Sequence, residues 1–334
     1  DKKMKFTAVV GNPPYQDESK NNHKDSVYHL FLDIAYSLSE LGTLITPARF
    51  LFGAGDTPKD WNSKFLSDRR IKVVAYYPNS KDVFSTVEIK GGVTYTMCDA
   101  KRNPGPIGTF IQSDELSSIL AKVKTDNTLD SIVYSPATYK LSDTAFAENS
   151  KLSESVGRER RFRTNIFEKV PYLFFAEKPQ EGDCYGIVGV CEGNKRIVQW
   201  TKASNVAENV NRDCYKVMVP KANGTGTLGE VLSSPMIGNP HLGHTETFIS
   251  MGAFDSKEEA EALMKYISTK FARALLGTLK VTQDNFPDAW ANIPMQDFTK
   301  NSDIDWNKTV AEIDQQLYAK YKLTSEEIQF IEST

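Results

Sequence analysis

The most constraining feature of the sequence is a short apolar run that leads into two consecutive prolines. Residues 6–10 are apolar and include two valines, and Gly11 follows directly. An apolar run bounded by a turn residue predicts a buried β-strand. The next four residues, Asn12-Pro13-Pro14-Tyr15, then stand at the carboxyl end of that strand. Open α/β sheets bind their ligands at this end of their strands, so the corner is a candidate site at the rim of a parallel sheet.

The diproline corner is stiff and presents hydrogen-bond acceptors. Proline fixes φ and lacks an N–H group, so Pro13 and Pro14 remove two flexible torsions and two donors. Asn12 precedes a proline and is therefore driven toward an extended conformation. The loop offers backbone carbonyls, the Asn12 amide and the ring of Tyr15, which together suit a flat group with an exocyclic amine. An ordinary proline-rich turn after a strand is the alternative interpretation of the same residues.

The corner resembles the Asn-Pro-Pro-Tyr motif of amino-methyltransferases that use S-adenosylmethionine. The resemblance makes Asn12, Pro13, Pro14 and Tyr15 the catalytic motif. It implies that the Asn12 side chain and the Pro13 carbonyl accept hydrogen bonds from the target amine, and that Tyr15 stacks on the target base. An adenine amine is a poor nucleophile because its lone pair is delocalised into the ring. Two acceptors in line with its protons favour a pyramidal nitrogen, which is catalysis by positioning.

The elements that follow the corner come in the order of the second half of that family's sheet. Ser26 fits a helix N-cap, and a helix is predicted over 26–40. Strands are predicted at 43–46 and 71–77, with a helix at 60–70 between them. The apolar positions at helical spacing in the first helix are Val27, Leu30, Phe31, Ile34, Ala35 and Leu38.

A later segment supplies a second candidate for stacking on the base. Gly91-Gly92 precedes an apolar and aromatic strand that ends near Met97. This segment is similar to a late family motif that lines the pocket of the target base, and the resemblance implies that Tyr95 stacks against that base. A core or edge tyrosine in a neighbouring register is the alternative. Residues 103–106 are rich in proline and glycine and predict a domain exit, so residues 1–108 are expected to form a partial methyltransferase domain.

The donor-binding part of the family's domain is not evident in the sequence. The resemblance places the glycine turn that binds S-adenosylmethionine on a strand earlier than the corner, and only five residues precede Phe6. We therefore expect the donor site to be incomplete, the chain to be a fragment that is inactive alone, and any nuclease domain to lie outside it.

Residues 109–334 have a mixed α/β texture, and beside the resemblance of the first part so long an appendage implies a target-recognition domain for DNA with a helical tail. Arginine pairs bidentately with phosphates and with guanine edges. The densest basic patch, around Phe162, and the tip of a hairpin predicted at 184–200 are therefore candidates for DNA contact. These residues are Arg158, Arg160, Arg161, Arg163, Lys195 and Arg196. A solvated surface run, balanced by Glu154, Glu159 and Glu168, is the alternative interpretation.

Two further features complete the prediction for this part. A single long helix is predicted over 256–279, with Ser256 as its cap and an apolar face that belongs to the core. Shorter helices are predicted at 308–320 and 325–331. The histidine pair His241 and His244 is expected on a loop or strand surface rather than at a metal.

Composition is consistent with this organisation and leaves several function classes open. The net charge is −3, so DNA binding would need a local basic face rather than an overall positive charge. The scattered cysteines and the lack of a long apolar run favour a cytoplasmic protein. The predicted fold class is α/β, the carboxyl-terminal half of a Rossmann-like methyltransferase sheet followed by a mixed α/β recognition domain.

The predicted function is site-specific N6-methylation of adenine in double-stranded DNA, within a fused restriction–modification enzyme of the type IIG kind. The target adenine would be extruded from the duplex and methylated directly at its amine. Two alternatives remain open, a methyltransferase that acts on protein or RNA and a DNA-recognition module without catalytic activity.

Overall fold

A computed structural model describes most of the chain as two compact units, residues 1–117 and 118–334. The described residues are 6–17, 25–53, 55–108, 110–111, 113–157, 160–191, 193, 195–224, 228–280 and 283–334. The predicted domain boundary between residues 108 and 109 stays a prediction.

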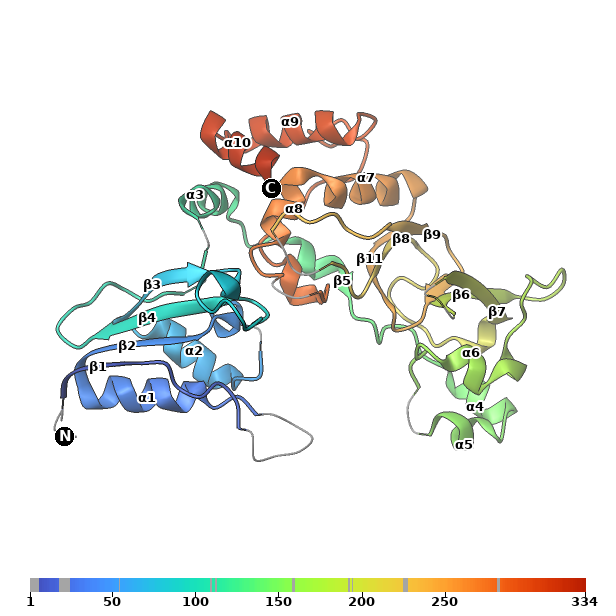
Figure 1. The fold of residues 1–334 in the computed structure, drawn as a ribbon. Coiled ribbons are helices and arrows are strands. Elements are labelled where there is room, and N and C mark those ends of the chain that lie inside the picture. The colour runs from blue at the N-terminus through green and yellow to red at the C-terminus, as the bar shows by residue number, and fades with distance from the viewer. Residues whose placement is uncertain are drawn as a thin grey trace. The chain divides into compact units, whose positions relative to one another are not determined.

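The first unit is built on a mixed four-stranded sheet in the order β1-β2-β4-β3 (Figure 1). Strands β1 and β2 pair in parallel across helix α1, and β4 runs antiparallel to both β2 and β3. A parallel sheet is expected from the sequence, but only β1 and β2 are parallel neighbours. Strand β4 lies between β2 and β3 and runs in the direction opposite to both. The bounds are β1 Phe6–Gly11, α1 Tyr28–Leu38, β2 Ser39–Pro47, α2 Lys59–Ser67, β3 Ile71–Tyr77 and β4 Val93–Asp99.

Helix α1 forms within the predicted range, but it begins at Tyr28 after Val27, so Ser26 is not its N-cap, and it buries a different face. The buried side chains are Tyr28, Leu32, Ala35 and Tyr36. By contrast, Leu30, Phe31 and Ile34 are exposed, by 51%, 40% and 54%. Both sets recur at helical spacing, so periodicity alone cannot tell which apolar stripe meets the sheet. A strand forms at 6–11 as predicted, but the expected burial is wrong: β1 ends the sheet among the described residues, and Phe6 and Val10 are exposed.

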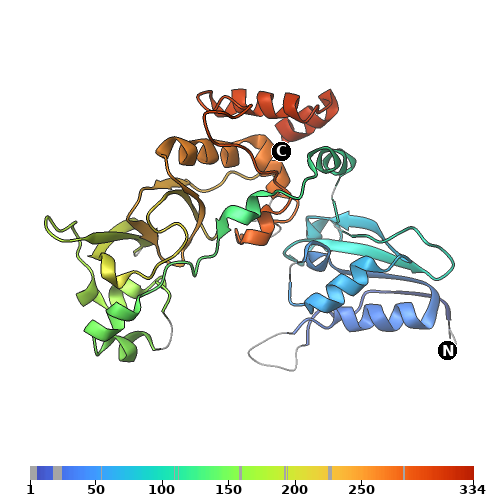
Figure 2. The same ribbon diagram turned by 180° about the vertical axis from the view of Figure 1, so that it is seen from behind.

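An aromatic core holds α1 and α2 against one side of this sheet (Figures 1 and 2). Trp61 and Phe65 of α2 stack with ring centroids 4.8 Å apart, and Phe65 meets Phe50 edge-on at 5.3 Å. The Tyr36 hydroxyl of α1 is 2.7 Å from the Thr96 hydroxyl of β4. Aromatic pairs of this geometry add to the free energy gained by burying their surface, so the core fixes both helices relative to β2 and β4.

The second unit contains two small sheets, in the orders β10-β6-β7 and β5-β11-β8-β9. The predicted hairpin is confirmed, because Cys184 pairs with Lys202 and Val190 with Arg196 in antiparallel register. The strand bounds are β5 Val133–Tyr134, β6 Cys184–Val190, β7 Arg196–Lys202, β8 Tyr215–Pro220, β9 Met236–Gly238, β10 Leu242–His244 and β11 Phe248–Phe254.

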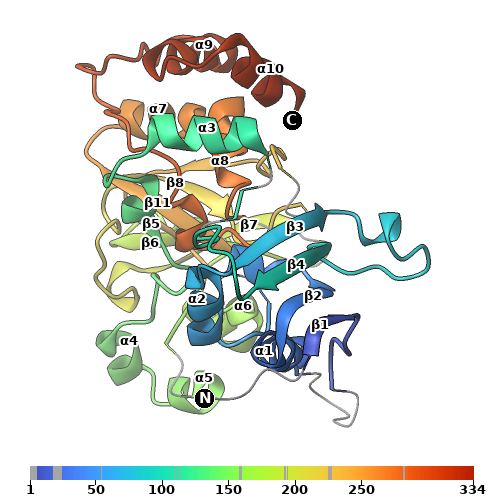
Figure 3. The same ribbon diagram turned by 90° about the vertical axis from the view of Figure 1, so that its left-hand side faces the viewer.

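Helices surround these sheets, and α9 and α10 pack on α7 and α8 (Figure 3). The helix bounds are α3 Asp114–Val123, which crosses the boundary between the units, α4 Asp143–Glu148, α5 Leu152–Val156, α6 Ile166–Lys169, α7 Lys257–Ser268, α8 Lys270–Leu276, α9 Val310–Lys320 and α10 Ser325–Ser333. In the part of the chain that the structure describes, no helix is both long and apolar enough to cross a bilayer.

The prediction of one long helix over 256–279 is wrong, because the structure has two helices there, α7 and α8, separated at Thr269. Thr269 is extended, with φ −63° and ψ 151°, and its side chain caps α8 by accepting from the Ala272 N–H. The Asp314 carboxylate of α9 accepts from the N–H groups of Lys270 and Phe271, at 3.0 and 2.9 Å. These acceptors satisfy the N–H groups that a new helix start leaves open. Ser256 caps α7 as predicted, through a capping box with Glu259.

The surface position expected for His244 is also wrong. The side chain is fully buried, and its ring lies 4.7 Å from the ring of Tyr139. Lys216 is buried beside the same tyrosine and donates to the carbonyls of Asn211 and Arg212, at 2.5 and 3.1 Å. Burial lowers the pKa of His244 to about 4 and that of Lys216 to about 8, because it disfavours the charged form of each group.

Candidate functional site

The diproline corner directly follows β1, as the sequence predicts. Asn12 and Pro14 are exposed, and Pro13 and Tyr15 are half-buried. The chain returns to the corner at the start of α1, where the Val27 N–H donates to the Tyr15 carbonyl at 3.1 Å. The corner is therefore anchored at both ends, while the Asn12 side chain remains accessible to a ligand.

Tyr15 is held as a neutral aromatic ring. It meets the ring of Tyr28 edge-on, with centroids 6.5 Å apart. Burial raises the pKa of Tyr15 to about 12, and the nearby Tyr95 adds to that rise. A phenol with this pKa is protonated at neutral pH and is a poor general base, so Tyr15 is not suited to accept a proton.

Tyr95 lies close to the corner because of strand register. Gly11 pairs with Leu44, and the next residue of β2, Ile45, pairs with Tyr95 of β4. Asn12 therefore stands level with Tyr95, and the two backbones are about 10 Å apart because neighbouring strands are about 4.8 Å apart. Thr96 faces α1, so alternation along the strand puts Tyr95 on the other face of the sheet, where its ring contacts Tyr77 at 6.1 Å.

Gly91 and Gly92 bring the start of β4 close to the chain that leaves β2. Both have positive φ, 81° and 74°. The Ala48 N–H donates to the Gly92 carbonyl at 3.0 Å. A Cβ on Gly92 would lie 2.1 Å from the Tyr77 carbonyl, and one on Gly91 would lie 2.5 Å from Arg49 Cγ. Only glycine fits such an approach, which explains the pair at this point in the sequence.

The structure also gathers buried polar atoms near the corner, most of them on residues that sequence reasoning did not assign to the site. Five side-chain atoms on the corner and the surrounding elements are buried and lack a hydrogen-bond partner among the described residues: Tyr15 OH, Ser26 Oγ, His29 Nδ1, Thr46 Oγ1 and Arg49 Nε. Buried polar groups are nearly always paired in folded proteins, so such atoms mark a place for a ligand or water. Thr46 and Arg49 lie at the carboxyl end of β2, next to β1. Their place at the end of a predicted strand could have identified them as candidate site residues.

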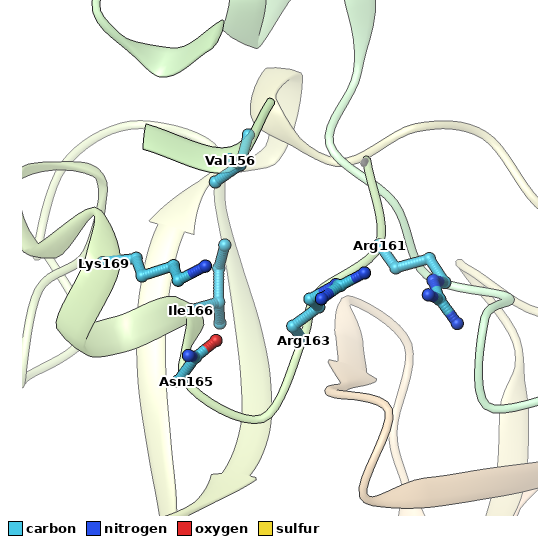
Figure 4. A pocket seen from close by; sticks show the side chains of 6 residues that line it. All are labelled: Val156, Arg161, Arg163, Asn165, Ile166 and Lys169. Atoms are coloured by element: carbon cyan, nitrogen blue, oxygen red, sulfur yellow. The ribbon is translucent and has the colours of Figure 1, made fainter. Parts of the chain in front are cut away.

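The basic patch around Phe162 separates into two environments. Arg158 lies outside the described residues. The Arg160 guanidinium is 2.5 Å from the Asp143 carboxylate and 5.1 Å from the ring centroid of Phe146. Arg161 and Arg163 instead line a surface hollow together with Val156, Asn165, Ile166 and Lys169 (Figure 4). The structure therefore places Arg160 away from the cluster to which the sequence assigned it.

The other two candidates for DNA contact lie at the start of β7 in the predicted hairpin. Lys195 and Arg196 are both exposed. The Cys191 N–H donates to the Lys195 carbonyl at 2.9 Å and closes the turn, and the Arg196 guanidinium lies 5.5 Å from the ring centroid of Phe248. Contact of these two side chains with DNA stays a prediction.

The described residues near the corner fit a target amine better than a methyl donor. Asn12 and the corner carbonyls supply acceptors, and two tyrosine rings lie nearby. The described part of the sheet ends at β1, however, so it contains no further strand on the side where the resemblance places the donor-binding turn.

Comparisons with known proteins agree with the motif. Residues 1–84 match the family model described as "Eco57I restriction-modification methylase". A Mycoplasma pneumoniae (strain ATCC 29342 / M129 / Subtype 1) protein described as an "Uncharacterized adenine-specific methylase" is 32% identical over 97 residues. That match covers 28% of this chain and 23% of the relative, so the chain spans less than a quarter of the relative's length.

Two solved restriction–modification enzymes are similar to the chain over most of its length. One is the type IIG restriction endonuclease BpuSI, at 12% identity and a TM-score of 0.34, covering 92% of this chain and 48% of that one. The other is the type IIL enzyme MmeI in complex with DNA, at 10% identity and a TM-score of 0.41, covering 98% and 56%. The sequence matches concern the amino-terminal part of this chain, which is similar to Eco57I restriction-modification methylases over residues 1–84.

Proposed function

We propose that this chain is part of an enzyme that methylates the N6 amine of adenine at specific sites in double-stranded DNA. The proposal includes S-adenosylmethionine as the methyl donor and a restriction–modification system as the setting. The observation that carries it is the corner geometry: Asn12 is exposed at the end of β1, level with Tyr95 and three residues before Tyr15. The match of residues 1–84 to restriction–modification methylases supports the same chemistry.

In this proposal the corner orients a flipped adenine. The Asn12 side-chain carbonyl and the Pro13 carbonyl each accept a hydrogen bond from one N–H of the amine, and Tyr15 stacks on the base. Pro13 and Pro14 hold these groups in place without a cost of reorganisation at the moment of reaction. Extrusion of the base is needed because the amine is not accessible to such a pocket inside a duplex.

The residues that bind the donor are proposed to lie outside the described residues of the first unit. The chain by itself would then bind DNA through its second unit without transferring a methyl group. A nuclease, where one accompanies the methylase, would also lie outside this chain.

The proposal is tested by expressing the natural reading frame that contains this chain in a host without DNA methylation. Single-molecule sequencing of the host DNA should then detect N6-methyladenine within one short recurring sequence. An Asn12→Ala variant should lower the methylated fraction about 100-fold or more, the usual scale for loss of one preorganised catalytic hydrogen-bonding group. An unmodified host genome, with the protein folded and abundant, would count against DNA as the substrate.

Methylation of RNA or of a protein glutamine is the main alternative activity, and the same cells can be used to examine it. Mass spectrometry of digested RNA and of the proteome would show a new methyl group there if the alternative holds. The Asn12→Ala variant serves as the matched control, because it should remove whichever modification the corner produces.

A further inference from the structure

We propose that the hollow lined by Arg161, Arg163, Asn165 and Lys169 is a binding site for one backbone phosphate of double-stranded DNA. This inference rests on the proposed function, because it takes DNA as the partner. It goes further by naming the site, the chemical group bound and the cationic residues that bind it. The hollow has an empty volume of about 370 Å³ and opens to solvent, as a site for a group on the outside of a duplex must.

The backbone that carries the two arginines is held rigidly. Phe162, which lies between them, is buried at 1% exposure in a hydrophobic core. Hydrogen bonds hold this segment: the Leu141 N–H donates to the Arg160 carbonyl at 2.7 Å, and the Glu246 N–H donates to the Phe162 carbonyl at 2.7 Å. The Arg163 N–H donates to the Arg161 carbonyl at 2.8 Å, so the chain turns tightly at Phe162, and both arginine side chains line the hollow.

The other wall of the hollow is the short helix α6. Ile166 is buried at 1% exposure and anchors the helix. The Lys169 N–H donates to the Asn165 carbonyl at 3.1 Å, and residues four apart lie on the same side of a helix. Asn165 and Lys169 therefore face the hollow together, and Figure 4 shows Lys169 on one side of Ile166 and the two arginines on the other.

The charges around the hollow favour an anion. Three of the described side chains that line the hollow are cationic, namely Arg161, Arg163 and Lys169. The Glu246 carboxylate lies 3.6 Å from the Arg161 guanidinium. Arginine donates in a planar fork that matches phosphate oxygens, and lysine adds a point charge. The chain has a net charge of −3, so a local cluster of this kind is what contact with a polyanion requires.

The position of Arg160 provides a matched control in the same segment. Its guanidinium pairs with Asp143 and lies over Phe146, outside the set of residues that line the hollow. A substitution at Arg160 removes the same formal charge from the neighbouring position without removing a group from the site.

The test measures affinity of the 334-residue chain for a mixed-sequence duplex by fluorescence anisotropy across a series of salt concentrations. A phosphate contact does not depend on base sequence, so the recognition sequence need not be known. Arg163→Gln and Lys169→Gln should each weaken binding several-fold and reduce the slope of log K against log salt by about 1. The double variant should lose little more than either single one, because both side chains hold one phosphate. Arg160→Gln should leave the slope unchanged.

A second measurement separates the site from nonspecific attraction. The side-chain NMR signals of Arg161 and Arg163 should shift on addition of inorganic phosphate, but not on addition of sodium chloride at equal ionic strength. Duplex binding with a wild-type slope in both Arg163→Gln and Lys169→Gln would overturn the inference and leave the proposed function standing. A wild-type chain that shows no salt-dependent duplex binding would instead contradict the assignment of DNA binding to this chain.

Discussion

Tyr15 and Tyr95 lie far apart in the sequence, yet they are near enough that Tyr95 helps to raise the pKa of the Tyr15 phenol. The register of β1, β2 and β4 brings them together, since the pairs Gly11–Leu44 and Ile45–Tyr95 place the corner and the middle strand at one level. The exposed Asn12 side chain and the Tyr15 ring therefore lie near a tyrosine from the middle of the sheet.

A pair of substitutions at Tyr15 separates its ring from its hydroxyl. The Tyr15 hydroxyl is buried without a hydrogen-bond partner among the described residues, so Tyr15→Phe should retain methylation and not lower stability. Tyr15→Ala removes the stacking surface, which is worth about 1–3 kcal/mol per base, and should weaken capture of a flipped base by about 5- to 150-fold. Fluorescence of 2-aminopurine at the target position of a duplex reports that capture. A large loss in Tyr15→Phe would show that the hydroxyl, not the ring, is used.

His244 should make the second unit sensitive to acid. Burial lowers the pKa of this histidine from 6.5 to about 4, so the unfolded chain takes up a proton between pH 6.5 and pH 4 while the folded state does not. The stability that depends on neutral His244 is present above pH 6.5 and is lost as the pH falls through this window. At about 1.4 kcal/mol per pKa unit, the loss approaches about 3 kcal/mol.

Urea unfolding at several pH values between 4 and 7 measures this effect. His244→Asn keeps a donor for the Thr245 carbonyl, which lies 2.9 Å from His244 Nδ1, and should flatten the dependence. His241→Asn changes a histidine whose side chain is 50% exposed, and it should leave the dependence as in the wild type. Equal pH profiles for His244→Asn and the wild type would refute the prediction.

Lys216 should make the folded chain more stable as the pH rises above 8. Burial lowers its pKa from 10.5 to about 8, so between these values the folded state has lost a proton that the unfolded chain keeps. Stability should therefore rise as the pH goes from 8 to 10.5, by up to about 3 kcal/mol. Lys216→Met should remove this rise, whereas Lys202→Met, at an exposed lysine of β7, should retain it. Thermal unfolding between pH 7.5 and 10 checks the prediction, and a rise that persists in Lys216→Met would contradict it.

The methyl donor should not bind to this chain alone. Strand β1 ends the described sheet, so the described residues lack the neighbouring strand on which the resemblance places the donor turn. Isothermal calorimetry with S-adenosylmethionine should give no binding heat when circular dichroism shows a folded chain. Tight, saturable binding would contradict the proposal that the donor site lies elsewhere.

Local signals in the sequence were sufficient for much of the first unit and for several helix starts. The apolar run before Gly11, the two prolines and the capping box at Ser256 each act on their own neighbours, and the structure has β1, the corner and α7 at those places. Prediction failed where two apolar stripes competed on α1. It also failed at Thr269, where the carboxylate that supports the new helix start comes from Asp314 on α9.

At the candidate sites, too, the sequence predicted local features but not contacts between distant segments. Composition and spacing identified Arg160, Arg161 and Arg163 as one basic run, but could not show that Asp143 and Phe146 draw Arg160 away from it. Lys169 was not singled out, because its place beside the arginines depends on how α6 packs.

By itself, the sequence determined the stiff acceptor-bearing corner, since proline torsions and the amide of Asn12 are properties of the residues themselves. Only the tertiary structure decided which rings stand beside that corner and which cations share a hollow. Those relationships depend on strand register and on packing between segments that are distant in the chain, and no local pattern encodes such contacts.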